Sequence, residues 1–221
     1  MKRVAFWVLA LLLSASAIAL TDKESKQINT IMQFYGERAG KRVTAWRNIV
    51  NDNASQDIDT KLQEVNDFFN QLIFIDDIKL WGKEDFWATP LEFLGVGAGD
   101  CEDFSIAKYF SLRELGVADN KLRLVYVKSL KFNQFHMVVA YYPTPSSVPL
   151  LLDNLDGDIK PATKRPDLLP IYSFNASKLW LMKQKGQGQL AGKASRLSLW
   201  NDLRQRSDRI KLNRPKINFD E

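Results

Sequence analysis

The hydrophobic residues in the first third of the chain recur with the spacing of an α-helix. Between Thr21 and about Phe74 they fall at i, i+3, i+4 and i+7 in two runs: Ile28, Ile31, Met32 and Tyr35, then Leu62, Val65, Phe68, Phe69 and Leu72. Asp57 and Asp59 can cap the second helix, because a short acidic side chain accepts hydrogen bonds from the free N–H groups of a first turn. We therefore expect this part of the chain to form helices that each bury one face.

The rest of the pattern predicts two further helices, a group of strands and a final helix. An aromatic-rich loop (WGKEDFWATP) leads into a short helix at Pro90–Leu94, and a helical run from Cys101 to about Leu115 stops at Gly116. An amphipathic helix is expected at about 195–209. Antiparallel strands are expected at 122–128, 135–142 and 150–155. Helices gathered on one side of an antiparallel sheet make an α+β fold.

The first 19 residues have the pattern of a secretory signal peptide. Lys2 and Arg3 precede the apolar run 4–13, and Ala17-Ile18-Ala19 is a small-x-small cleavage site. The apolar run is too short to cross about 30 Å of hydrocarbon. We therefore expect cleavage before Leu20, export from the cytoplasm, and a mature protein that does not span the membrane.

The mature part, residues 20–221, is long enough to bury its own core as a single domain. The net charge of the whole chain is +5, but residues 178–221 hold eleven Lys/Arg against four Asp/Glu, so the C-terminal helix and tail (about 185–221) are basic. Basic segments are typical of nucleic-acid binding, yet export argues against a nucleic-acid partner. An anionic lipid, an acidic partner and a merely solvated basic face remain as alternatives.

The chain has one cysteine, Cys101, and one histidine, His136. Exported proteins that use cysteine structurally pair it, so a lone thiol indicates chemistry. Cys101 follows Gly97-Ala98-Gly99-Asp100 and opens a predicted helix. Free N–H groups there lower the pKa of a thiol and can bind an oxyanion during acyl transfer. The alternative is a buried, inert cysteine, which the glycines and polar neighbours do not favour.

A base and an orienting acid for this thiol lie on two predicted strands. His136 is near the start of the strand 135–142, and Asp153 ends the apolar run Leu150-Leu151-Leu152. An aspartate beside a histidine fixes the imidazole tautomer and stabilises the imidazolium. The alternatives are a packed histidine and a turn-forming aspartate.

Three acidic residues, Asp100, Glu102 and Asp103, crowd the thiol. Negative charges nearby raise the pKa of a thiol, and so they oppose the lowering of this pKa by the helix N-terminus. Either these side chains point away from Cys101, or a hard divalent cation with oxygen ligands, above all Ca²⁺, neutralises them. The stretch DNLDGD at 153–158 is a second candidate, although it lacks the downstream glutamate of an EF-hand.

Several motifs in the right order resemble the bacterial transglutaminase-like cysteine proteinases. The resemblance covers roughly residues 25–180 and is carried by these segments: WATPLEFL (87–94), GDCEDF (99–104), AKYF (107–110), LRLVYV (122–127), HMVVAYY (136–142) and LDNL (152–155). The resemblance implies a papain-like α+β fold and a Cys-His-Asp triad formed by Cys101, His136 and Asp153. It also implies dependence on Ca²⁺, with Asp100 and Glu102 as ligands and Asp103 as a third.

The same resemblance implies a role in adhesion. Members of this family are periplasmic endopeptidases that cut a large cell-surface adhesin near its N-terminus, at a di-alanine site, and so release cells from a biofilm. An inner-membrane receptor for cyclic di-GMP sequesters the protease. Two other readings share the fold: a transglutaminase that transfers the acyl group to an amine, and a non-catalytic binding module. A binding module has no reason to keep a free exported thiol, so we expect an enzyme.

Overall fold

The computed structural model describes residues 20–182 and 188–220. The proposed signal peptide at 1–19 lies outside the described residues. In the described ranges, no helix combines the length and the apolar character that a membrane crossing requires. The helices are α1 (Asp22–Tyr35), α2 (Glu37–Asp52), α3 (Ile58–Asn70), α4 (Asp77–Leu80), α5 (Pro90–Val96), α6 (Cys101–Glu114) and α7 (Ser198–Arg209). Short 3₁₀ turns occur at Asp119–Lys121, Ala162–Lys164 and Ala194–Arg196.

The helical first third agrees with the prediction except at its end. Asp57 caps α3 by accepting from the Thr60 N–H at 2.9 Å, as its position in the sequence indicated. The chain leaves the helical conformation after Asn70, and residues Ile73–Phe74 form the strand β1 instead. This strand pairs in parallel with β2 (Ala98–Gly99), directly before Cys101. The segment after α3 is thus hydrogen-bonded to the residues directly before α6.

The main sheet has seven strands in the order β6-β5-β4-β3-β7-β8-β9, and all neighbours are antiparallel. Its strands are β3 (Leu122–Ser129), β4 (Gln134–Tyr141), β5 (Leu150–Leu152), β6 (Lys160–Pro161), β7 (Leu168–Phe174), β8 (Lys178–Leu181) and β9 (Gln189–Lys193). The three predicted strands correspond to β3, β4 and β5, although β5 ends three residues early. β7 was not predicted. Pro170 interrupts its pattern, and the ladder tolerates this proline through a register shift opposite Tyr126 and Val127.

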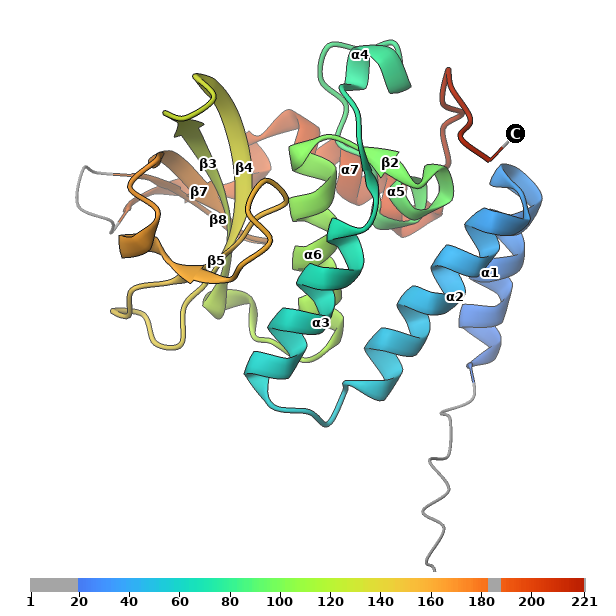
Figure 1. Cartoon of the computed structure of the whole chain (residues 1–221), viewed down its shortest axis with the longest axis horizontal. Coiled ribbons are helices and arrows are strands. Elements are labelled where there is room, and N and C mark those ends of the chain that lie inside the picture. The colour runs from blue at the N-terminus through green and yellow to red at the C-terminus, as the bar shows by residue number, and fades with distance from the viewer. Residues whose placement is uncertain (1–19, 183–187, 221) are drawn as a thin grey trace, which may run out of the picture.

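The sheet presents different faces to the two sides. On β4, Met137, Val139 and Tyr141 belong to the main core, whereas Val138 and Ala140 belong to a smaller apolar cluster on the other face. Helix α6 contacts both β4 and β3, and α3 contacts α6 from the far side. Figure 1 shows this arrangement, with α6 between the sheet and the layer that contains α3, α2 and α1. The structure therefore has the predicted α+β arrangement.

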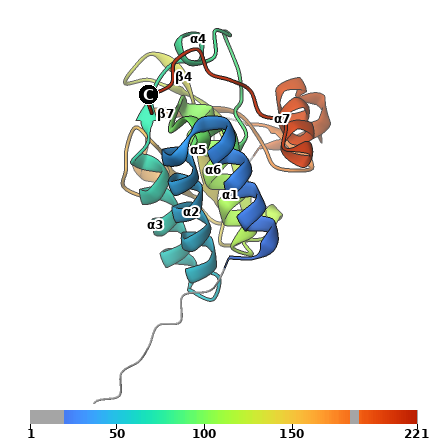
Figure 2. The ribbon, with the colours of Figure 1, turned by 90° about the vertical axis from the view of Figure 1, so that its right-hand side faces the viewer.

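The C-terminal segment packs on the domain instead of projecting from it. Trp200 of α7 is completely buried against Tyr109, Phe110 and Phe174. After α7 the chain returns across the molecule to the side of α1 and α4 (Figure 2). There the Lys216 N–H donates to the Leu80 carbonyl at 2.7 Å.

Candidate active site

The nucleophile candidate, Cys101, is the first residue of α6. The chain enters this helix tightly: a Cβ added at Gly99 would lie 2.4 Å from Oδ2 of Asp103 and 2.9 Å from the Phe93 ring. Only glycine fits such an approach without a shift of its neighbours. Asp103 accepts hydrogen bonds from the Asp100 N–H at 3.3 Å and from the Ala88 N–H at 2.7 Å. This carboxylate joins the helix start to the loop before α5.

The thiol of Cys101 is nearly buried, with 9 % of the residue exposed. Its Sγ donates to Oε2 of Glu102 at 2.8 Å. Burial, followed by the charges of Glu102 and Asp100, raises the pKa of the thiol well above its usual value, and a bond from the Met137 N–H opposes this only in part. Burial is thus the main cause of the raised pKa, and the repulsion foreseen from the acidic neighbours adds to it.

His136 and Asp153 form a buried pair at the edge of the sheet. Leu152 pairs with Val139 across β5 and β4, so the chain leaving β5 passes the first half of β4. His136 Nε2 lies 2.6 Å from Oδ1 of Asp153, and each residue is 1 % exposed. Cys101, the third residue of the expected triad, lies close to this pair but makes no hydrogen bond with His136 within the described residues. Within the described residues the side-chain hydrogen bond of Cys101 is with Glu102, and its contact with β4 is through Met137, next to His136. Hydrogen bonds of a catalytic pair are often long without substrate.

Asp153 has a second buried partner, Arg165, which no sequence motif singled out. Oδ2 of Asp153 accepts from Arg165 at 2.9 Å, while Oδ1 also accepts the Leu155 N–H at 3.0 Å. Burial acts to raise the pKa of Asp153. The bond and charge of His136, the Leu155 N–H and Arg165 together lower this pKa to about 2. Asp153 is therefore an anion at neutral pH.

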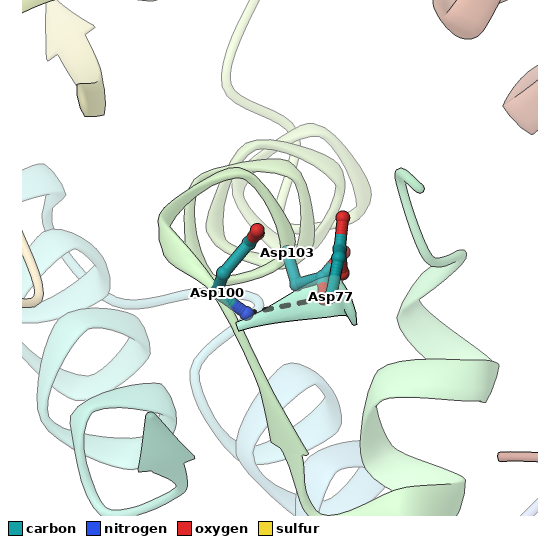
Figure 3. A group of neighbouring side chains, drawn as sticks. All are labelled: Asp77, Asp100 and Asp103. Atoms are coloured by element: carbon teal, nitrogen blue, oxygen red, sulfur yellow. Dashed lines mark hydrogen bonds between the residues drawn. The ribbon is translucent and has the colours of Figure 1, made fainter. Parts of the chain in front are cut away.

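Three carboxylates gather beside the nucleophile. Ligand oxygens of Asp77, Asp100 and Asp103 lie within 4.8 Å of one another. Figure 3 shows the three neighbouring side chains. Asp77 is the first residue of α4, and the other two lie at the start of α6. Burial raises the pKa of Asp77 to about 7, that of Asp100 to about 11 and that of Asp103 well above its usual value. Repulsion from neighbouring carboxylates adds to each rise, and the charge of Glu102 contributes to all three. Oδ1 of Asp77 and Oδ1 of Asp100 are buried and have no hydrogen-bond partner within the described residues.

The structure thus brings together two of the three predicted ligands, Asp100 and Asp103, and adds Asp77. The third predicted ligand, Glu102, turns its carboxylate to the Cys101 thiol. Asp77 was missed because its distance along the chain from Asp100 and Asp103 gives no sign that the three carboxylates lie together.

The second candidate metal stretch, 153–158, is neutralised by protein cations. Both carboxylate oxygens of Asp156 accept from Lys160, at 2.9 and 2.8 Å, and Asp158 lies 3.2 Å from the same ammonium. Asp153 is held by His136 and Arg165. These oxygens have cationic partners already, so the stretch does not resemble a vacant cation loop.

A thiol at a helix start, packed on an antiparallel sheet that carries a buried imidazole–carboxylate pair, is the arrangement typical of transglutaminase-like cysteine enzymes. The family model described as bacterial transglutaminase-like cysteine proteinase BTLCP matches residues 21–186, and the chain belongs to this family. This confirms the resemblance seen in the sequence motifs. No curated protein matches the chain.

Solved structures of Legionella pneumophila LapG are similar to this chain. An EGTA-treated form is 42 % identical, with a TM-score of 0.74, and the match covers 83 % of this chain and 96 % of the LapG chain. A calcium-bound form is 43 % identical with a TM-score of 0.72, with coverage of 82 % and 98 %. The likeness confirms the fold predicted from the sequence.

Proposed function

We propose that this chain is a calcium-dependent cysteine endopeptidase of the periplasm, with Cys101 as nucleophile, His136 as base and Asp153 as orienting acid. The hydrogen bond between His136 and Asp153 carries the proposal, because it joins the only imidazole of the chain to a buried carboxylate beside the strand that contacts Cys101. Membership of a cysteine proteinase family supports the reaction class. Residues 1–19 would direct export and be removed.

In the proposed reaction His136 takes the proton of Cys101, and the thiolate attacks the scissile carbonyl. Asp153 holds the imidazole in one tautomer and stabilises its charged form. The Cys101 N–H, at the start of α6, donates to the oxyanion. His136 then protonates the leaving amine, and water hydrolyses the thioester.

The carboxylate cluster fits a hard divalent cation. Two of its buried oxygens, on Asp77 and Asp100, have no donor within the described residues, and such oxygens are costly to bury alone. Asp77, Asp100 and Asp103 would hold Ca²⁺, and Glu102 is the further ligand that the family motif implies. The calcium-bound form of LapG supports Ca²⁺ as the ion. Bound calcium supplies positive charge that offsets the repulsion between these carboxylates and the thiolate.

For substrate and control we propose what the family resemblance implies. The substrate would be a large cell-surface adhesin, cut near its N-terminus at a di-alanine site so that cells leave a biofilm. An inner-membrane receptor for cyclic di-GMP would hold the protease inactive by sequestering it.

The test is cleavage of a purified adhesin N-terminal fragment that contains a di-alanine site. Native protein, Cys101→Ala, and native protein with a calcium chelator are compared, and calcium is added back to the third sample. We expect cleavage only in the native sample and after calcium is restored. Cleavage that survives chelation would remove calcium from the proposal, and cleavage by Cys101→Ala would remove the nucleophile.

A transglutaminase would use the same three residues, so the products decide between the two reactions. We repeat the assay with an added primary amine and analyse the products by mass spectrometry. Hydrolysed termini support the protease, whereas amine-labelled termini would replace it with an acyl transferase.

A further inference from the structure

We propose that Arg165 is a positioning residue for the catalytic apparatus, holding the Asp153 carboxylate so that one oxygen faces His136. This inference rests on the proposed function, because it concerns the acid member of that triad. Arg165 lies 12 residues after Asp153, beyond β6 and a 3₁₀ turn.

The guanidinium is fixed at both ends. One terminal nitrogen donates to Oδ2 of Asp153 at 2.9 Å. Nε and the other terminal nitrogen donate to the two carboxylate oxygens of Asp167, at 3.0 and 2.9 Å. The Arg165 side chain is 7 % exposed, while that of Asp167 is 31 % exposed. The guanidinium is planar and makes two hydrogen bonds to the Asp167 carboxylate. Its remaining terminal nitrogen is therefore held in a fixed direction toward the Asp153 carboxylate.

The Asp153 carboxylate needs such a constraint, because its two oxygens have separate tasks. Oδ1 bonds His136 and the Leu155 N–H, and Oδ2 bonds Arg165. Rotation about the last side-chain bond is broad for aspartate. Without the guanidinium, Oδ2 would lose its charged partner and the carboxylate plane would be free to turn away from the imidazole.

Arg165 is also the permanent cation of this site. The groups whose charges act on Asp153 include His136, Arg165, the buried ammonium of Lys108 and the Asp167 carboxylate. Lys108 donates to the amide oxygens of Asn66 and Asn70, and burial lowers its pKa to about 7. Lys108 therefore loses its charge as the pH rises above 7, whereas an arginine stays charged.

The experiment compares Arg165→Met and Arg165→Lys with Asp167→Asn, a control that weakens the outer anchor and leaves the Asp153 contact in place. We expect Arg165→Met to lower kcat by about 10²-fold with little change in KM, because a misdirected catalytic group costs about this much. As the pH is lowered, the Arg165→Met variant should lose activity at a higher pH than the native protein does. The reason is that Asp153 loses a hydrogen bond that favours its anion, so its pKa rises. Arg165→Lys should recover part of the loss, and Asp167→Asn should lose less than Arg165→Met.

A double-mutant cycle separates positioning from general stability. In an Asp153→Asn background, Arg165→Met should change kcat/KM within about twofold, because the partner that it positions is gone. A full-sized loss in that background would overturn the proposal. So would native kcat and pH dependence in a folded Arg165→Met or Arg165→Lys.

One readout does not depend on catalysis. The chain has a single histidine, so the ring N–H proton bonded to Asp153 is one identifiable NMR resonance. We expect it to move upfield and exchange faster in Arg165→Met and Arg165→Lys, and less so in Asp167→Asn. If native protein cleaves nothing, the protease proposal fails, and this resonance still decides the role of Arg165: an unchanged resonance in both Arg165 variants would refute it.

Discussion

The buried ion pair between Arg206 and Glu92 ties the C-terminal helix to the rest of the domain. Glu92 of α5 is completely buried, and it accepts from the Thr89 N–H at 2.9 Å and from the Asn213 side chain at 2.6 Å, besides its contact with Arg206. Arg206 also donates to the Trp87 carbonyl at 2.5 Å. The Arg206→Met substitution keeps an unbranched apolar side chain and removes the cation. It leaves Glu92 with neutral donors only.

Removal of one partner from a buried pair costs about 3–5 kcal/mol, because the other charge stays desolvated. The neutral donors to Glu92 moderate this cost, so we expect Arg206→Met to lower the free energy of unfolding by about 3 kcal/mol. A domain of this size is stable by roughly 5–15 kcal/mol, so the loss is easily measured. Glu92→Gln in the same chain should recover part of it, since the unpaired charge is then gone.

The assay is urea unfolding followed by tryptophan fluorescence, with Trp87 and Trp200 as buried probes. Arg204→Met is the matched control. Arg204 lies on the same helix and donates to the Ala176 carbonyl in an exposed bond, so its loss should stay within about 0.5 kcal/mol. The reasoning is refuted if Arg206→Met costs under about 1 kcal/mol, or if adding Glu92→Gln makes the protein less stable still.

Three further predictions concern the candidate site. Cys101→Ala should abolish cleavage and leave the circular dichroism spectrum and urea midpoint close to native; retained activity would contradict the assigned nucleophile. Asp77→Asn should weaken calcium binding in calorimetry by roughly 10- to 100-fold, because the charge of the ligand set governs affinity, whereas exposed Asp76→Asn should not. Calcium affinity should fall as the pH drops through 7, since the raised pKa values of Asp77 (about 7) and Asp100 (about 11) make protons compete with the ion. A pH-independent affinity, with no proton release on binding, would contradict this competition.

Local signals in the sequence were sufficient for the parts of the site that lie on regular elements. The helix predicted from Cys101 begins at that residue, and the strand around His136 was placed within one residue at each end. Asp153 was expected at the end of its apolar strand, and the strand does end at Leu152, although the prediction ran on to 155. Periodicity and the order of the motifs carry this information directly.

The contacts made by loops were not predictable in this way. Asp77 and Arg165 reach the site from segments with no periodicity, and their placement depends on how β1 and the 3₁₀ turn before Arg165 pack in three dimensions. The basic tail was expected to be a solvated face or a binding segment for an anionic partner. Within this tail, Arg206 is 6 % exposed and pairs with Glu92, 114 residues earlier in the chain. A count of charges cannot foresee a pairing that only the tertiary structure creates.

The contact between Cys101 and Glu102 bears on the chemical durability of the protein. Oxidants and stray electrophiles attack the thiolate form of cysteine, and they need access to it. Here the sulfur is nearly buried, and its pKa is raised well above the usual value. A chain with one cysteine cannot shelter it in an internal disulfide. Burial, and after it the charges of Glu102 and Asp100, raise the pKa of this thiol, so the same surroundings also limit the thiolate that oxidants attack.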